Sequence, residues 1–116
     1  MLIKQVLVIM LGGALGALLR WRLSTLSLGE SFPFGTLAAN LVGCFALGVV
    51  LGITRPGSLV NLFWVAGLCG ALTTFSTLML EVVEAKTWGL ALGYLWVSLV
   101  AGLIALLGGL KLSRLF

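Results

Sequence analysis

Four long apolar segments alternate with short polar interruptions along the chain. Each segment reaches the roughly 20 residues with which a helix crosses a hydrocarbon layer about 30 Å thick. The pattern therefore predicts an all-α integral membrane protein, a single domain over residues 1–116 with four transmembrane helices. The expected spans run from about Ile3 to Leu28, Phe34 to Ile53, Leu59 to Val83 and Trp88 to Leu112.

Turn-forming residues separate these spans. Glycine, a carboxylate and proline occur together in GESFP (Gly29 to Pro33), and further turns are expected at TRPG (Thr54 to Gly57) and EAKT (Glu84 to Thr87). The first span resembles a signal peptide because Lys4 precedes its apolar run. That run is too long, however, and lacks a small-residue cleavage site, so we expect a helix of the mature protein.

Composition supports a membrane protein that associates with itself. Hydrophobic residues make up 61% of the chain and charged residues 9%. Four helices with little loop can barely shield a polar group from lipid, where an unsatisfied donor or acceptor costs several kcal/mol. Small residues four positions apart, which allow helices to approach closely, also support association. They are Gly12 and Gly16, Gly48 and Gly52, Gly89 and Gly93, and Ala101, Ala105 and Gly109.

The basic residues are divided almost evenly between the two sides of the membrane. With four spans, the cations on one side are Lys4, Arg55, Lys111 and Arg114, and those on the other side are Arg20, Arg22 and Lys86. Because the two sides carry nearly equal numbers of basic residues, the positive-inside rule predicts no clear orientation in the membrane. We expect dual topology, in which oppositely inserted copies pair as an antiparallel dimer. The alternative is one orientation set by a weak bias and by folding.

Most catalytic chemistry is absent from the sequence. The chain has no histidine, and its carboxylates, Glu30, Glu81 and Glu84, all fall near predicted span ends. No nucleophilic triad or soft-metal site can be assembled, and Cys44 and Cys69 stand alone on different spans. Proton-coupled transport is disfavoured, because it generally needs an ionisable group at membrane depth. We therefore expect no enzyme, and nothing indicates nucleic-acid binding.

Neutral hydrogen-bond donors remain within the spans. Thr36 and Asn40 share one face of the second helix, and Tyr94 and Ser98 repeat the same spacing on the fourth. Asparagine is costly to leave facing lipid. It either bonds a neighbouring helix or offers its two amide protons to an anion.

Hydroxyl groups crowd the middle of the third span, in GLCGALTTFSTLMLE (Gly67 to Glu81). Thr73, Thr74, Ser76 and Thr77 occupy successive positions, so one helical face cannot hold them all. A regular helix would use some of them in bonds to the preceding turn. The alternative is an interruption near Gly67 to Thr74, a stretch that has the glycines and β-branched residues suited to a break. Such a break would free backbone carbonyls for a cation and a half-helix N-terminus for an anion.

These rows of donors are suited to lining a narrow passage, free of fixed carboxylate charge, for an anion that resists dehydration. Arg20 is either an interface anchor beside Trp21 or an electrostatic attractant in a pore vestibule. Phe75 is either a packing residue or an aromatic ring whose positive edge faces an anion.

Three stretches resemble the Fluc fluoride channels, also called CrcB proteins. They are GGALGALLRW (Gly12 to Trp21), FGTLAANLVGC (Phe34 to Cys44) and the hydroxyl-rich stretch of the third span, in the family's order and on matching spans. The resemblance implies a dual-topology antiparallel dimer in the inner membrane of a bacterium or archaeon. Its two pores would conduct fluoride passively out of the cytoplasm and exclude chloride.

The resemblance also implies roles for individual residues. Pore or fluoride-binding positions would be Asn40, Thr36, Phe75, Ser76, Thr77, Tyr94 and Ser98, with Arg20 in the vestibule and Glu81 as the family's span-three glutamate. The resemblance further implies that the third helix is broken, and that the backbone carbonyls of Gly70 and Thr73 in this break hold a structural sodium ion at the dimer centre.

The sequence departs from the family pattern at three positions. The second phenylalanine of the span-three motif is Leu78, the serine next to it is Met79, and a span-four serine is Gly102. The chain is expected either to form a homodimer or, with one pore lining partly degenerate, to pair with a related four-span chain.

Two other classes of membrane protein are compatible with this four-span layout. A small multidrug exporter shares the length and the four spans, but it relies on a glutamate in its first span, which has no acidic residue here. A structural membrane subunit would use the hydroxyls only to bond helices together and would carry no ion flux.

Overall fold

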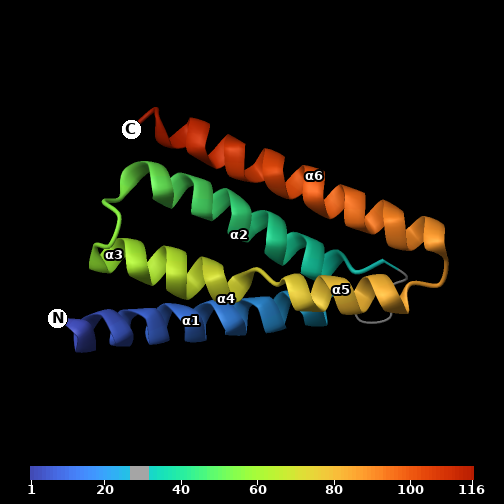
Figure 1. Cartoon of the computed structure of the whole chain (residues 1–116), viewed down its shortest axis with the longest axis horizontal. Helices are drawn as coiled ribbons and strands as arrows, with labels where there is room; N and C mark the ends of the chain where they lie inside the picture. Colours follow the sequence, from blue (N-terminus) through green and yellow to red (C-terminus); the bar gives the residue numbers. More distant parts are fainter. Residues whose placement is uncertain (27–31) are drawn as a thin grey trace.

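The computed structural model describes residues 1–26 and 32–116, and their regular structure is helical throughout (Figure 1). Its elements are α1 (Leu2–Thr25), α2 (Phe34–Ile53), α3 (Leu59–Asn61), the π-helix η1 (Leu62–Cys69), α4 (Gly70–Leu72), α5 (Phe75–Glu84) and α6 (Trp88–Ser113). Elements α3 to α5 together form the third span. The predicted end of the first span at Leu28, and most of the first predicted turn, lie outside the described residues.

Within the described residues, four helical spans are long and apolar enough to cross a membrane, which confirms the all-α membrane architecture. α2 packs mainly against α6, and α1 packs mainly against η1. The two termini lie at the same end of the bundle, as expected for an even number of spans (Figure 1).

Glycines allow backbone-to-backbone packing in two seams. A Cβ atom on Gly48 would overlap the carbonyl oxygen of Leu106, and one on Gly109 would overlap that of Phe45, so these glycines join α2 to α6. Gly12 and Gly16 bring α1 equally close to the backbone of η1, and Gly16 also approaches the backbone of α4 at Leu72. We call these four residues the glycine seams.

The small residues predicted to support self-association therefore serve mainly within the chain. Gly52 also packs inside it, against the side chain of Ser113. By contrast, a Cβ atom on Gly93 would meet nothing within 4 Å, and one on Gly89 would meet only Thr87, at 3.8 Å. This last pair remains available for a contact between chains.

The third span is interrupted, as predicted, at the C-terminal edge of the expected range. Thr73 (φ −84°, ψ 148°) and Thr74 (φ −148°, ψ 122°) are extended, and α5 restarts at Phe75. Of the glycines and β-branched residues expected to suit this break, the threonines take the extended conformation, whereas Gly67 and Gly70 are helical. Gly67 packs against α1, and within the described residues Gly57 alone has a positive φ among glycines. Threonines in extended backbone make the break.

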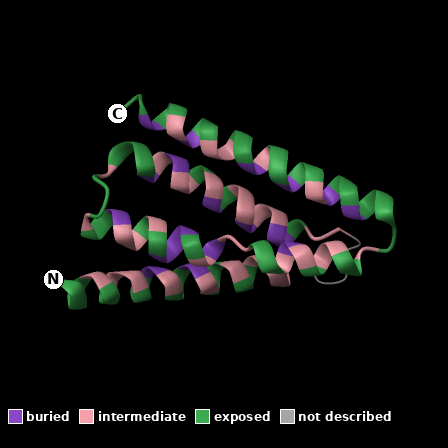
Figure 2. Ribbon diagram, viewed as in Figure 1, coloured by how far each residue is buried: buried purple, intermediate pink, exposed green. Residues whose placement is uncertain are grey.

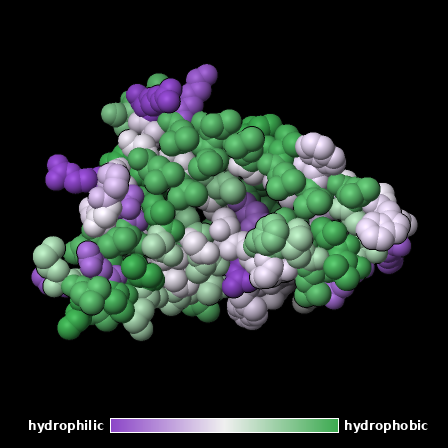
Figure 3. All heavy atoms as spheres, in the orientation of Figure 1, coloured by the Kyte–Doolittle hydropathy of each residue, from purple (hydrophilic) through white to green (hydrophobic). Residues whose placement is uncertain are grey.

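The surface of the bundle is suited to lipid. Large apolar side chains are exposed along every span, and the buried residues lie on the inward faces (Figure 2). In Figure 3 hydrophobic side chains cover most of the visible face, and hydrophilic ones gather mainly at its ends. The chain is a multi-pass membrane protein with a small core built around Ala39, Leu68, Cys69 and Leu72.

Candidate functional site

A carboxylate joins three of the four spans. Glu81 of α5 accepts a hydrogen bond from the Thr36 hydroxyl of α2 at one oxygen, and from the Tyr94 hydroxyl of α6 at the other (2.7 Å). Thr36 and Tyr94 are buried, and Glu81 is half-buried. Each hydroxyl compensates one carboxylate oxygen for lost hydration, so the group is stabilised where water is scarce. We call these three residues the polar cluster.

The prediction of a donor row free of carboxylate charge is wrong. Glu81 lies near the end of its span, as its position in the sequence indicates. However, α5 packs against α6 and turns the face that carries Leu78 and Glu81 inward. The carboxylate consequently lies between two hydroxyls, of Thr36 and Tyr94, that were predicted to face an anion in the passage.

The Asn40 side chain supplies the hydrogen-bond acceptor that the Thr74 amide loses at the break. In a continuous helix the amide of Thr74 would donate to the carbonyl of Gly70. Here it donates to Asn40 Oδ1 (2.7 Å), and Asn40 Nδ2 donates in return to the Thr74 carbonyl (3.3 Å). Of the two uses considered for Asn40, the structure shows the contact with a neighbouring span. The second amide proton of Asn40 is not needed for this pair.

The hydroxyls around the break have separate tasks. Thr73 Oγ1 donates to the Cys69 carbonyl (2.9 Å), which is the bond to the preceding turn considered above. Thr74 caps α5, because its hydroxyl oxygen accepts the amide of Thr77 (3.2 Å). The same hydroxyl lies 3.2 Å from Thr77 Oγ1 and 3.3 Å from Ser76 Oγ. Ser76 is exposed and Thr77 is half-buried.

Arg20 anchors α1 to the break. Its Nε donates to the Ala71 carbonyl (2.9 Å), and the residue is half-buried rather than fully exposed. A guanidinium can make this contact and still offer its remaining donors elsewhere. The vestibule role of Arg20 stays a prediction.

Phe75 and Leu78, one turn apart on α5, point in different directions. Phe75 is 70% exposed, whereas Leu78 is 5% exposed and packs inside its own chain. Met79 is half-buried. Phe75 therefore presents its ring to whatever lies outside this chain, and Leu78 contributes to its interior.

Ser98 is a buried hydroxyl without a hydrogen-bond partner in the described structure. It lies one turn beyond Tyr94 on α6, and the next turn on that face is Gly102. A Cβ atom on Gly102 would lie 3.7 Å from Cys44 Sγ, so there is room for a small side chain. Because the Ser98 hydroxyl has no partner among the described residues, it can donate a hydrogen bond to a ligand. No group of three or more metal-ligating side chains occurs among the described residues.

The sequence pattern did not predict a role for Asn61. This buried residue donates from Nδ2 to Thr54 Oγ1 (2.9 Å) and accepts from the amide of Gly57 (3.4 Å). Its own amide donates to Ser58 Oγ, which caps α3 (3.2 Å). A cap residue three positions before an asparagine is a signal that could have indicated this role. Asn61 closes the loop between the second and third spans.

Comparison with known proteins gives one consistent result. The profile of the family described as CrcB-like protein, Camphor Resistance (CrcB), matches residues 7–110. The chain is 37% identical over 123 residues to a protein of Chloroflexus aurantiacus, covering 97% of this chain and 98% of the relative. A protein of Leptospira interrogans is 40% identical over 86% of this chain and 87% of its own length. A third, from Chromobacterium violaceum, is 45% identical over 74% of this chain and 73% of the relative. All three are named fluoride-specific ion channel FluC.

Proposed function

The chain belongs to the CrcB family, and from that membership we propose that it is a passive fluoride-selective channel of the cell membrane, not an enzyme. The observation that carries the proposal is the row of hydroxyl donors on Thr36, Tyr94 and Ser98. Two of these hydroxyls already donate to an anion, the carboxylate of Glu81, and the third has no hydrogen-bond partner among residues 1–26 and 32–116.

Such a row suits fluoride. A small anion gives up its hydration only where hydroxyl or amide protons replace the water, and a channel must also let the ion leave. We infer that fluoride competes with the Glu81 carboxylate for the hydroxyls of Thr36 and Tyr94. The negative charge of Glu81 would weaken the binding of fluoride enough for release. The competition needs no covalent or redox step.

The approach to this row would be lined from α2 and α5. The second amide proton of Asn40 and the hydroxyls of Ser76 and Thr77 supply donors near the break. The exposed ring of Phe75 can face fluoride with its positive edge without adding an ionisable group. We propose that Arg20 raises the local concentration of anions at the mouth.

We further propose that the working unit is an antiparallel dimer. Phe75 projects from its own chain, so a pore wall that includes it needs a second surface. The unused Gly89 and Gly93 pair and the even distribution of cations are compatible with such pairing.

A structural sodium ion at the centre of the dimer fits the break. The amide of Thr74 donates to Asn40, which releases the Gly70 carbonyl from the helical pattern, and Thr73 ends α4 in extended backbone. Both residues therefore have backbone carbonyls suited to a hard cation. Sodium would supply positive charge that holds the two breaks together.

A heterodimer with a related four-span chain is the second candidate. It is favoured by Leu78, Met79 and Gly102, where the family pattern is lost. Leu78 is buried, so the replacement of the family's phenylalanine at this position affects the interior of its own chain. Glycine in place of the family's serine at Gly102 leaves the face that carries Ser98 with one hydroxyl fewer.

Fluoride efflux from liposomes that contain this chain alone tests the proposal, with chloride as the control ion. We expect fluoride to pass and chloride to be retained. Asn40→Asp and Phe75→Ile should abolish fluoride flux, while the exposed, helix-end variant Glu84→Gln should not. Wild-type flux that survives both pore variants would refute the assigned path. Flux that appears only when a second four-span chain is added would identify the heterodimer.

A further inference from the structure

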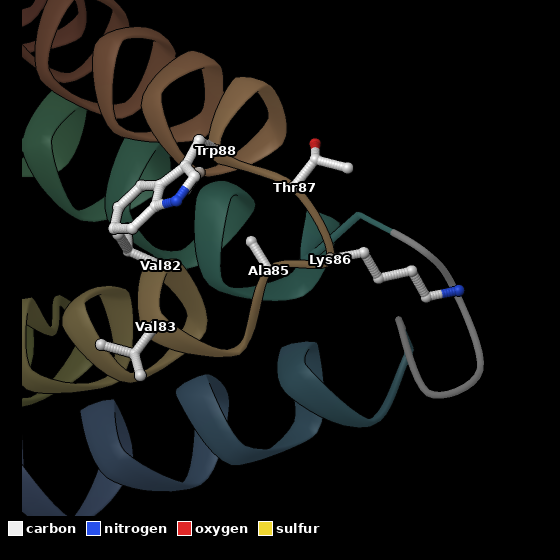
Figure 4. Close-up of a pocket in the computed structure, with 7 residues that line it drawn as sticks. Val82, Val83, Ala85, Lys86, Thr87 and Trp88 are labelled. Atoms are coloured by element: carbon white, nitrogen blue, oxygen red, sulfur yellow. The ribbon is translucent and has the colours of Figure 1, made fainter.

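A groove of about 420 Å³ lies between the end of α5 and the start of α6 (Figure 4). The proposed fluoride path does not use its side chains. Its walls are apolar except at the linker, where the Lys86 side chain extends outward. The lining residues are Val82, Val83, Ala85, Lys86, Thr87, Trp88 and Ala91.

The groove lies where two spans reach the edge of the hydrocarbon layer. α5 ends at Glu84 and α6 begins at Trp88, so the linker joins two spans that are long and apolar enough to cross a membrane. The ends of such spans meet the lipid headgroups. Val83 is 82% exposed and Trp88 is 80% exposed. Tryptophan is enriched at this level of the bilayer because its ring is apolar and its indole N–H is polar. The groove therefore faces lipid at the boundary between headgroup and acyl chain.

The charge of the groove is positive. Lys86 is its charged lining residue, and it makes no ion pair or hydrogen bond with the part of the chain that the structure describes. Thr87 caps α6 by accepting the amide of Leu90 (3.1 Å), which leaves its hydroxyl proton to donate. The nearest carboxylate in sequence, Glu84, is exposed at the end of α5 and does not line the groove.

We propose that this groove binds an anionic phospholipid. Its phosphate accepts hydrogen bonds from the Lys86 ammonium and the Thr87 hydroxyl, and the upper part of an acyl chain lies against Val83 and Trp88. An ammonium and a hydroxyl are strong donors to phosphate oxygens. A zwitterionic headgroup carries its own cation, which Lys86 repels, so the groove discriminates in favour of net negative lipids.

Quenching of Trp88 fluorescence tests this site directly. Replacing Trp21, Trp64 and Trp96 by phenylalanine leaves Trp88 as the single tryptophan of the full-length chain in bilayers. Phosphatidylglycerol brominated on its acyl chains should occupy the site about fivefold more readily than brominated phosphatidylcholine, as expected for one lysine near an anionic surface. Equal quenching by the two lipids would overturn the proposal.

Matched variants separate the groove from general surface charge. Lys86→Gln should remove the preference and Lys86→Arg should keep it. Lys111→Gln, at an exposed cation in the last turn of α6, should also keep it. Loss of the preference in both glutamine variants would show a diffuse charge effect and contradict the site. Displacement of the lipid by millimolar glycerol phosphate would mean that the groove takes a soluble phosphate instead. Because the readout is not ion flux, the result is independent of channel activity.

Discussion

The glycine seams and the polar cluster hold the same bundle together by different means. In the seams, Gly48 and Gly109 bring α2 and α6 into backbone contact with no polar side chain involved. In the polar cluster, Thr36, Glu81 and Tyr94 join α2, α5 and α6 through two hydrogen bonds to one carboxylate. Lipid provides no hydrophobic force between helices, so shape and internal hydrogen bonds must supply the association.

The difference indicates how stability and function are divided. The seams have no spare donor or space, whereas the polar cluster holds hydroxyls that can exchange one anionic acceptor for another. We expect changes in the seams to prevent folding and changes in the polar cluster to alter stability moderately and flux strongly.

The largest effect should come from Gly109→Leu. Its new side chain would overlap the backbone of α2, and overpacking costs about 1–3 kcal/mol even where side chains can move. The adjacent Gly108→Leu is the matched control, because a Cβ atom there meets nothing within 4 Å. Yield and thermal unfolding in detergent measure the difference. A Gly109→Leu variant as stable as wild type would break the seam interpretation.

Glu81→Ala should have the next largest effect. It leaves the buried hydroxyls of Thr36 and Tyr94 without an acceptor, which costs about 1–3 kcal/mol for an unsatisfied group. Thermal unfolding should detect the loss, and fluoride efflux should fall as well. Glu84→Ala, at an exposed carboxylate three residues later on the same helix, should change neither quantity. If both variants melt alike, the two hydrogen bonds do not contribute to stability.

Thr74→Val should have a smaller effect. Valine keeps the branched shape suited to the extended backbone but removes the oxygen that caps α5, a loss of about 1 kcal/mol. The unfolding temperature should fall modestly. Ser76→Ala, at an exposed hydroxyl that caps no helix, serves as the control. An unchanged unfolding temperature for Thr74→Val would show that the cap is dispensable.

Gly102→Ser should have the smallest effect on stability. The nearest atom to its Cβ would be Cys44 Sγ at 3.7 Å, an ordinary contact, so the unfolding free energy should change by no more than about 0.5 kcal/mol. Fluoride flux should rise, because the added hydroxyl extends the row beyond Ser98. Gly109→Ser adds the same side chain within a seam and should destabilise the protein. Lower flux in a stable Gly102→Ser variant would argue against a path along this face.

Much of the fold could be predicted because each span is a continuous apolar run bounded by turn residues. The second span was predicted at the bounds that α2 has, and the fourth differs by one residue at its end. The interruption of the third span was also predicted, since successive hydroxyls cannot share one helical face. Its cause was not, because the partner that replaces the helical acceptor is Asn40, 34 residues away in the chain.

The site was less accessible to prediction. Thr36, Tyr94 and Ser98 were identified as donors from their residue types and spacing. That Glu81 stands between Thr36 and Tyr94 depends on how α5 restarts after the break, and the sequence pattern does not specify that direction. The exposure of Phe75 and the burial of Leu78 follow from the same geometry. The pore roles of these residues, and the sodium site, stay predictions.

By itself the sequence determined that the chain is embedded in lipid and how many times it spans the membrane. It also determined the small set of polar groups that would be costly to leave unsatisfied in lipid. These properties follow from local composition and length, because a helix in hydrocarbon satisfies its backbone within one segment. Tertiary structure alone decided that the glycines serve seams within the chain, that Asn40 completes the break, and that Glu81 occupies the donors of Thr36 and Tyr94. Each of these contacts joins residues distant in the chain, and its direction depends on helix packing, which periodicity does not encode.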